Sequence, residues 1–66
     1  MYVTVNGKKE ELDSELALDQ FLIKQNIQAT YVAVAVNCEF VPKSQYSKKH
    51  LQQGDDIEIV TPHPGG

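Results

Sequence analysis

Short stretches of alternating apolar and polar residues open and close this chain, and a stretch with helical spacing lies between them. Residues 2–5 are rich in β-branched and aromatic side chains, which favours a strand. Asn6 and Gly7 follow, and both tolerate the positive φ that a tight hairpin turn requires. A second strand is therefore predicted over residues 8–12.

An amphipathic helix is predicted over residues 18–25. The positions that would form its buried stripe follow the i, i+3, i+4, i+7 spacing of one helical face: Leu18, Phe21, Leu22 and, as a polar member, Gln25. The start of the helix is ambiguous by one turn. Ser14 is a good capping residue but lies early, whereas Ala17 has no side-chain oxygen to offer the free N–H groups.

Strict alternation predicts a further strand over residues 31–37. One face of this strand carries three valines that are expected to pack against the helix: Val32, Val34 and Val36. The other face carries Tyr31, Ala33 and Ala35. This second face is apolar and mostly small, where a solvent-facing strand would carry charged residues or Thr, so it is a candidate docking surface. The alternative is that the loop around Tyr46 covers it.

The last third of the chain predicts two more strands. A short strand over residues 40–41 is expected before a helical turn that begins near Ser44. A turn at 53–56 precedes a strand over 57–60, in which Val60 points outward. The order β-β-α-β-β predicts a single α+β domain, with one main helix packed on one face of a mixed sheet of four to five strands.

The predicted domain covers residues 1–61, and a flexible tail covers residues 62–66. Two prolines keep this tail extended, and it ends in Gly65 and Gly66. Because glycine lacks Cβ, such an end can be threaded into a narrow active-site channel. The Gly66 carboxylate is therefore a candidate for activation by a partner enzyme, with Gly65 providing access. The alternative is a frayed chain end without a function.

Size and composition argue against an enzyme. A chain of 66 residues buries only about 60% of the surface that its unfolded form exposes, which leaves little room for a deep substrate cleft. The sequence contains no arrangement typical of a catalytic triad, a carboxylate pair or a phosphate-binding loop. A binding or carrier role is favoured instead.

The charge balance favours protein partners. Six lysines, with no arginine, stand against nine acidic residues, which gives a net charge of −3. Nucleic acids and anionic membranes select a basic excess, so neither is expected as a partner. The single cysteine, the lack of a signal segment at the start and the lack of an apolar run of about 18 residues lead us to expect a cytoplasmic location.

Several reactive residues have plain structural interpretations. Cys38 could carry a persulfide, but a passive turn cysteine is favoured because no His or Arg nearby in the sequence would activate it. His50 and His63 lack the spacing of metal ligands, so no metal site is expected. Asp55 and Asp56 are expected to belong to a solvated acidic turn, whose charges could help to orient a partner.

Five features of the sequence together resemble the ThiS family of thiamine-biosynthesis sulfur carriers. They are the opening Val3-Thr4-Val5-Asn6-Gly7, the pair of runs Ala35-Val36-Asn37 and Phe40-Val41-Pro42, the aromatic Tyr46, the stretch from Gly54 to Pro62, and Gly65-Gly66. The resemblance covers nearly the whole chain, and its specificity lies in the combination. The related MoaD carriers of molybdopterin synthesis share the fold and the tail but look longer and match less closely.

The resemblance implies a β-grasp, ubiquitin-like fold and a role as a protein substrate rather than an enzyme. A ThiF-like, E1-related enzyme would use ATP and magnesium to adenylate the Gly66 carboxylate, so the chain itself would bind no cofactor. Sulfur from cysteine, delivered by a desulfurase or sulfurtransferase, would then form a Gly66 thiocarboxylate for thiazole synthase (ThiG). Gly65 would serve access, and the flat face around Ala33, Ala35 and Val60 would dock the partners.

Other functions fit the same pattern: a sulfur carrier for molybdopterin synthesis, a ubiquitin-like modifier that forms isopeptide bonds through Gly66, or a plain interaction module. The chain also departs from the family pattern at two positions. Ala17 stands where a helix-capping Thr is common, which predicts a loss of roughly 1 kcal/mol of helix stability. Pro64 removes an N–H that a partner channel could have bonded.

Overall fold

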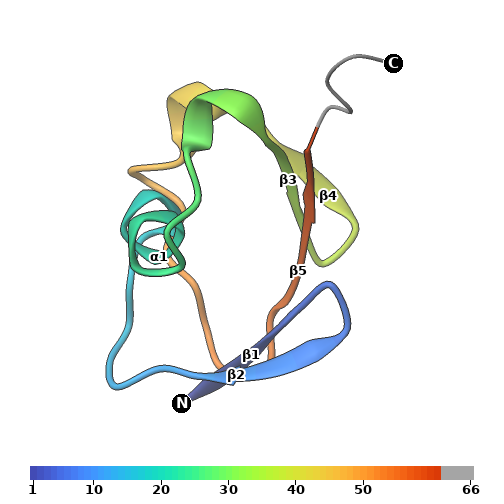
Figure 1. The fold of residues 1–66 in the computed structure, drawn as a ribbon. Helices are drawn as coiled ribbons and strands as arrows, with labels where there is room; N and C mark the ends of the chain where they lie inside the picture. The colour runs from blue at the N-terminus through green and yellow to red at the C-terminus, as the bar shows by residue number, and fades with distance from the viewer. Residues whose placement is uncertain (62–66) are drawn as a thin grey trace.

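The computed structural model describes residues 1–61 and has a five-stranded sheet with one α-helix on one face (Figure 1). The strands are β1 (Tyr2–Val5), β2 (Lys8–Glu11), β3 (Ala33–Val36), β4 (Glu39–Val41) and β5 (Asp56–Val60). The helices are α1 (Leu18–Lys24) and two short 3-10 helices, η1 (Ala29–Tyr31) and η2 (Lys43–Gln45). This architecture confirms the predicted α+β class.

The sheet is mixed, and its last strand lies in the middle. The strand order is β2-β1-β5-β3-β4, so β5 is inserted between the β1–β2 hairpin and the β3–β4 hairpin. β5 runs parallel to β1 and antiparallel to β3. The strand that leads to the chain end is therefore paired on both sides.

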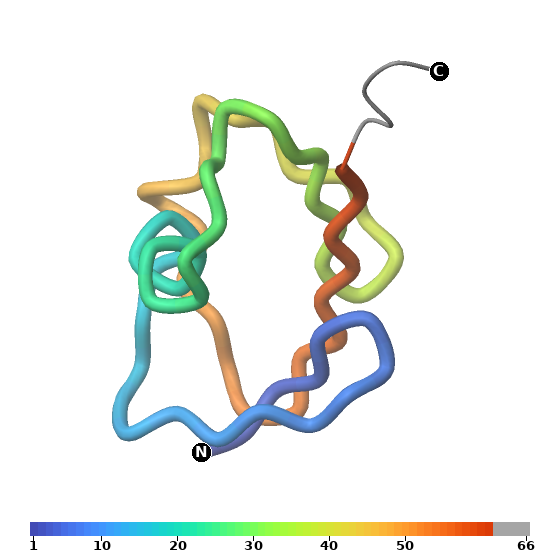
Figure 2. Tube along the Cα trace, in the orientation of Figure 1, coloured from blue at the N-terminus to red at the C-terminus, as the bar shows by residue number. Residues whose placement is uncertain are grey.

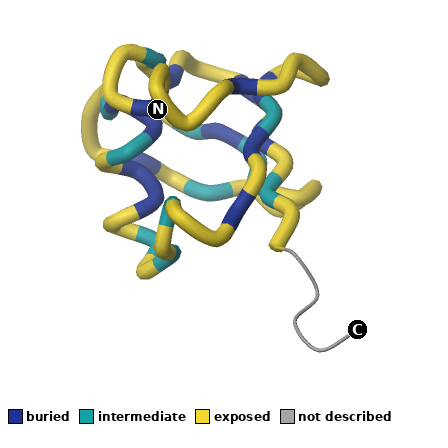
Figure 3. The backbone as a smooth tube through the Cα atoms, turned by 90° about the horizontal axis from the view of Figure 1, so that it is seen from above, coloured by how far each residue is buried: buried dark blue, intermediate teal, exposed yellow. Residues whose placement is uncertain are grey.

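The core lies between α1 and the inner face of the sheet. The predicted inward valines are buried, and so are the helix residues Leu18, Phe21 and Leu22, which are fully inaccessible. Gln25 is half-buried and ends the helix as its C-terminal cap. Figure 3 marks the buried stretches along the backbone in dark blue. The valines of β3 and the apolar face of α1 thus pack against each other, as the sequence predicts.

The strand expected over residues 31–37 is shorter than predicted. Tyr31 lies in η1, where its N–H donates to the Gln28 carbonyl at 3.1 Å, and β3 begins only at Ala33. At the other end Asn37 belongs to a turn rather than to the strand. The Tyr31 side chain is exposed. Because Tyr31 belongs to this 3-10 helix, it is not part of the strand face of Ala33 and Ala35 on which alternation had placed it.

Helix α1 begins at Leu18 without a capping hydroxyl, and other groups accept the hydrogen bonds of its first turn. The Leu18 N–H donates to the Lys49 carbonyl at 2.7 Å, and the Asp19 N–H donates to the Tyr46 carbonyl at 3.2 Å. The Gln20 N–H donates to the Asp19 carboxylate at 2.8 Å, so the N–H groups that a cap would serve have partners both from a distant segment and from the first turn itself. These partners give a physical reason to expect a smaller loss of helix stability at Ala17 than the roughly 1 kcal/mol of a missing cap.

Within residues 1–61, no helix has the length and apolar character needed to cross a membrane.

Candidate functional site

An exposed apolar surface, called here the outer patch, lies on the face of β3, β4 and β5 that points away from α1. It consists of Ala33, Ala35, Phe40 and Val60. Phe40 is 66% exposed and Val60 is 62% exposed. Single exposed apolar side chains are common, but a contiguous apolar surface indicates an interaction site. Between them lies a shallow hollow of about 200 Å³.

Strand register brings the outer patch together. Ala33 pairs with Val60 across β3 and β5, and Ala35 pairs with Phe40 across β3 and β4. Directly opposed residues of neighbouring strands share one face of a sheet, so these four side chains form one continuous surface. The structure therefore juxtaposes the three residues that the sequence predicted as a docking face.

The loop around Tyr46 does not cover this surface. The Tyr46 side chain belongs to the core cluster, is 4% exposed, and donates a hydrogen bond from its hydroxyl to the Val32 carbonyl at 3.4 Å. Burial raises the pKa of this phenol above its ordinary value. The alternative interpretation of the Ala33 and Ala35 face is therefore wrong, because the loop packs on the inner side of the sheet.

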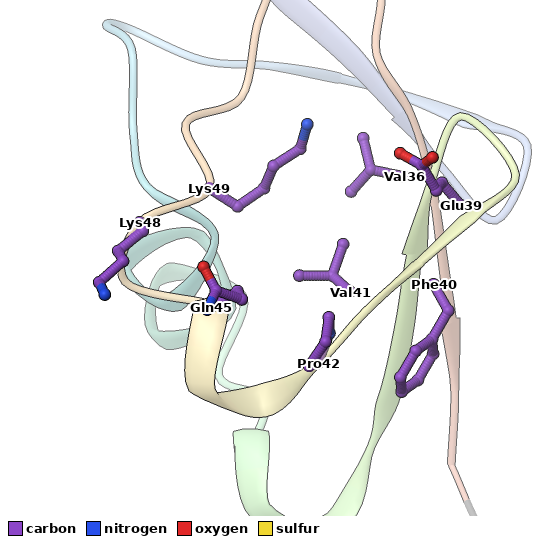
Figure 4. A pocket seen from close by; sticks show the side chains of 8 residues that line it. All are labelled: Val36, Glu39, Phe40, Val41, Pro42, Gln45, Lys48 and Lys49. Carbon is purple, nitrogen blue, oxygen red and sulfur yellow. The ribbon is translucent and has the colours of Figure 1, made fainter.

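Phe40 is the member of the outer patch that sequence reasoning missed. Figure 4 shows its ring pointing away from Val36 and Val41, although all three residues line a second hollow of about 180 Å³. The turn at Asn37 and Cys38 determines the position of Phe40, and identifying that turn would have predicted it. Both have positive φ, 53° and 67°, so they form a two-residue hairpin loop. Such a loop places Phe40 opposite Ala35.

Acidic side chains border the outer patch on β5. Glu58 pairs with Ala35 and lines the hollow of the patch. Asp56 lies two residues earlier on the same face of the strand and accepts a hydrogen bond from the Thr4 hydroxyl at 2.9 Å. Both residues are exposed. The surface thus combines an apolar centre with a negatively charged rim.

Asp55 does not belong to that rim, which corrects the expectation of a solvated acidic turn. It is 9% exposed. Its carboxylate accepts the Gln52 N–H at 2.8 Å and the side-chain amide of Asn37 at 3.0 Å. A buried carboxylate must be hydrogen-bonded, and these two donors come from the turn before β5 and from the β3–β4 hairpin. Asp55 therefore ties the start of β5 to its neighbour.

The tail residues Pro64, Gly65 and Gly66 lie outside the described residues. The structure describes the chain as far as Thr61, which directly follows Val60 of the outer patch. The route toward Gly66 therefore starts at the border of the patch.

The remaining candidate residues stay apart from this surface. Cys38 is an exposed free thiol at the tip of the β3–β4 turn, as the turn interpretation predicted. His50 forms an isolated main-chain bridge with Ala17. In the part of the chain that the structure describes, no three metal-binding side chains come together.

Comparison with known families adds to this geometry. The model of the ThiS family matches residues 2–66. The chain belongs to the ThiS family. The match includes all of the outer patch and the stretch beyond Thr61, so the family assignment covers both the folded domain and the candidate tail.

Solved structures agree with this ThiS-family assignment. A crystal structure of the thiamine biosynthesis protein ThiS from Geobacter metallireducens is 30% identical to the chain, covers both chains in full and superposes with a TM-score of 0.88. A solution structure of a thiamine biosynthesis protein from the same organism is also 30% identical, with a TM-score of 0.83 over the whole of this chain and 88% of that one. The fold is therefore the β-grasp, ubiquitin-like fold that the resemblance implied.

A much longer curated relative also matches. A thiazole synthase from Paramagnetospirillum magneticum is 32% identical to this ThiS-family chain over 66 residues. The match covers all of this chain but only 20% of that protein. The chain thus spans about a fifth of the length of that relative.

Proposed function

We propose that this chain is a sulfur carrier of thiamine biosynthesis, which holds sulfur as a thiocarboxylate at Gly66 and delivers it to thiazole synthase. The observation that carries the proposal is likeness along the whole chain. The ThiS family model extends from residue 2 to residue 66, and the ThiS structure from G. metallireducens matches over the full length of both chains. An interaction module without tail chemistry would not need the match to extend through the final glycines.

The thiazole synthase of P. magneticum supports the choice of sulfur acceptor. That single protein includes a segment resembling this chain. Two modules in one polypeptide meet at a high effective concentration without a strong interface between them. A carrier that is not joined to its thiazole synthase must instead reach it by docking, which would give a role to an exposed apolar surface.

The chemistry follows from the poor reactivity of a carboxylate. A ThiF-like enzyme, using its own ATP and magnesium, would transfer AMP to the Gly66 carboxylate and release pyrophosphate. The resulting mixed anhydride is a good electrophile, and the terminal sulfur of a persulfide on a desulfurase or sulfurtransferase would displace AMP to give an acyl disulfide. A thiol would then reduce the S–S bond, which releases the Gly66 thiocarboxylate and forms a disulfide. Gly65 has no side chain to obstruct entry into the partner's channel. This chain supplies an acyl group and a docking surface, and its partners supply catalysis.

The outer patch is the surface that we assign to docking. Phe40 and Val60 are the large exposed side chains, and the small residues Ala33 and Ala35 leave room around them. An aromatic anchor that enters a partner pocket is a common source of binding free energy. The acidic border at Glu58 favours a basic rim on the partner, which would raise the association rate and fix the orientation.

Intact-mass measurement tests the proposal. The protein is incubated with the adenylating enzyme of its own organism, Mg-ATP, a cysteine desulfurase and cysteine, and fragmentation then locates any change. Exchange of oxygen for sulfur at Gly66 is the expected result. Deletion of Gly66 should abolish the exchange, while the circular dichroism spectrum stays that of the folded domain.

Cys38→Ser is the matched control, because Cys38 is the other candidate for carrying sulfur. This variant should still form the thiocarboxylate. Sulfur added at Cys38 instead of Gly66 would contradict the proposal. Conjugates to lysine that survive reducing, denaturing gels would favour a ubiquitin-like modifier in its place.

A further inference from the structure

Two asparagines with left-handed backbones hold β5 from opposite sides. Asn6 has a φ of 51° and Asn37 a φ of 53°, and each lies in a two-residue hairpin turn. Both turns approach β5 in the chain trace (Figure 2). Each side-chain amide bonds to β5 or to the residue just before it, but at opposite ends of the strand.

Asn6 forms hydrogen bonds near the C-terminal end of β5, where the chain leaves the sheet. Its Nδ2 donates to the Ile59 carbonyl at 3.2 Å, and the Ile59 N–H donates to its Oδ1 at 2.8 Å. One amide thus satisfies both main-chain groups of Ile59 on that side. This is the pair of hydrogen bonds that a neighbouring strand would otherwise provide.

The topology explains why a side chain is needed at this position. β1 pairs with β5 only at Thr4 with Asp56 and at Val5 with Ile57, and then turns away. β5 continues for three further residues, to Val60. On its other side β3 pairs with β5 as far as Val60. Without the amide of Asn6, the last part of β5 would be held from one side only.

We propose that Asn6 is a positioning residue for the reaction at Gly66. This inference rests on the proposed sulfur-carrier function. β5 carries Val60 of the outer patch, and Thr61 leaves directly after it, so the end of β5 links the docking surface to the tail. A fixed direction at this end of the strand would reduce the number of positions that the tail can sample when a partner binds the patch. Small errors in placing a reacting group cost large factors in rate.

The chain itself offers a matched control. Asn37 accepts the Asp56 N–H at 2.9 Å and donates to the Asp55 carboxylate at 3.0 Å, at the start of β5. Glycine adopts left-handed φ freely, so Asn6→Gly and Asn37→Gly each keep the turn and delete only the amide. Asn37→Gly also removes one partner of a buried carboxylate. If general stability set the rate, Asn37→Gly would be the more damaging change.

The experiment measures pyrophosphate exchange by the adenylating enzyme, with the carrier concentration varied and all proteins shown to be folded at the assay temperature. Asn6→Gly should lower kcat by about tenfold, with KM changed by less than about twofold, because docking is intact and alignment is lost. Asn37→Gly should keep the wild-type kcat. Asn6→Asp retains the acceptor for the Ile59 N–H and should give an intermediate kcat.

A second readout needs no partner. Amide hydrogen exchange at Ile59 should accelerate by about tenfold or more in Asn6→Gly relative to Asn37→Gly, since only the first variant frees that N–H.

The outcomes separate this inference from the function on which it rests. If the wild type is adenylated and Asn6→Gly has the same kcat, or if both glycine variants lose kcat equally, Asn6 has no positioning role and the carrier function stands. Unchanged exchange at Ile59 would equally overturn the role of the amide. If the wild type is not adenylated at all, the proposed function fails, and the role of Asn6 fails with it.

Discussion

Asp55 lies in an acidic stretch of the sequence, yet its carboxylate is buried and bonded to two donors. Removing it leaves the Gln52 N–H and the Asn37 amide without their acceptor. We expect Asp55→Ala to lower the free energy of unfolding by about 1–3 kcal/mol. Urea unfolding followed by circular dichroism measures this, with the m-value checked for constancy.

The exposed neighbour Asp56 provides the control for that measurement. Its hydrogen bond from the Thr4 hydroxyl is exposed to water, so Asp56→Ala should cost less than about 1 kcal/mol. Equal losses for the two variants would show that burial of Asp55 contributes nothing to stability.

Ionisation of Tyr46 should lower the free energy of unfolding at alkaline pH. Burial raises the pKa of its phenol in the folded protein, so the neutral form stabilises the fold. This contribution is fully present below the unfolded-state pKa of about 10 and is lost as the pH rises through the higher folded-state pKa. Tyr46→Phe should therefore lose less unfolding free energy than the wild type between about pH 9 and pH 11.5.

Urea titrations at those two pH values check the prediction, and Tyr31→Phe is the control because it removes an exposed phenol. That variant should retain the alkaline loss of the wild type. If Tyr46→Phe loses as much stability as the wild type, ionisation of Tyr46 is not coupled to folding.

Among the elements, the β3–β4 hairpin has a residue, Cys38, in a backbone conformation that is unfavourable for a side chain with a Cβ. Cys38 has a φ of 67°, a left-handed conformation that costs a residue with a Cβ about 1–2 kcal/mol. Glycine avoids that cost but loses more entropy on folding. We therefore expect Cys38→Gly to raise the free energy of unfolding by about 0.5–1 kcal/mol, measured by denaturant unfolding.

Cys38→Ala separates the backbone from the thiol. It removes the sulfur but keeps the Cβ, so stability should remain within about 0.5 kcal/mol of the wild type. A gain in the alanine variant equal to that in the glycine variant would assign the effect to the thiol and not to φ.

At the start of α1, a substitution that usually stabilises a helix, the introduction of an N-cap serine, is expected to have no stabilising effect. Ala17 is 5% exposed, and the N–H groups after it already donate to the carbonyls of Lys49 and Tyr46. A serine hydroxyl at position 17 would be buried and would compete for donors that are already used. Ala17→Ser should therefore give none of the roughly 1 kcal/mol that an N-cap usually contributes. Thermal unfolding checks this, and a clear rise in Tm would contradict it.

At the scale of the whole molecule, the sequence predicts those features that depend on neighbours along the chain. The alternation of Val32, Val34 and Val36, the spacing of Leu18 and Phe21, and the hairpin at Asn6 all follow from local rules and are confirmed. Each needs only a window of a few residues. The two hairpins and the helix between them follow in the predicted order, although the order β-β-α-β-β is one strand short of the five observed and omits η1.

Features that depend on pairing between distant segments could not be predicted. The Asn37 partner of Asp55 is 18 residues away, and the Asn6 partner of Ile59 is 53 residues away. The place of Phe40 in the outer patch depends on the register of β4, which required the Asn37 turn type to be identified first. For the tail, the sequence prediction stays a prediction, because Gly65 and Gly66 lie outside the described residues.

The placement of α1 on one side of the sheet and the outer patch on the other predicts which face binds the proposed partners. Phe40 in the outer patch and Ile23 on α1 are both large and exposed, at 66% and 76%, but lie on opposite sides of the sheet. Phe40→Ala should weaken binding to the two proposed partners, an adenylating enzyme and a thiazole synthase, by about 2 kcal/mol, or roughly 30-fold in Kd. Ile23→Ala should change either Kd by less than about twofold.

Isothermal titration calorimetry with each partner measures both variants. The two substitutions remove similar exposed apolar surface, so each should leave the free energy of unfolding within about 0.5 kcal/mol of the wild type. A difference in binding would then reflect location and not folding. If Ile23→Ala is the variant that weakens binding, the helix face is the docking surface. In that case partners would approach from the side opposite to the outer patch, and the border shared by Val60 and Thr61 would lose its significance for delivery of the tail.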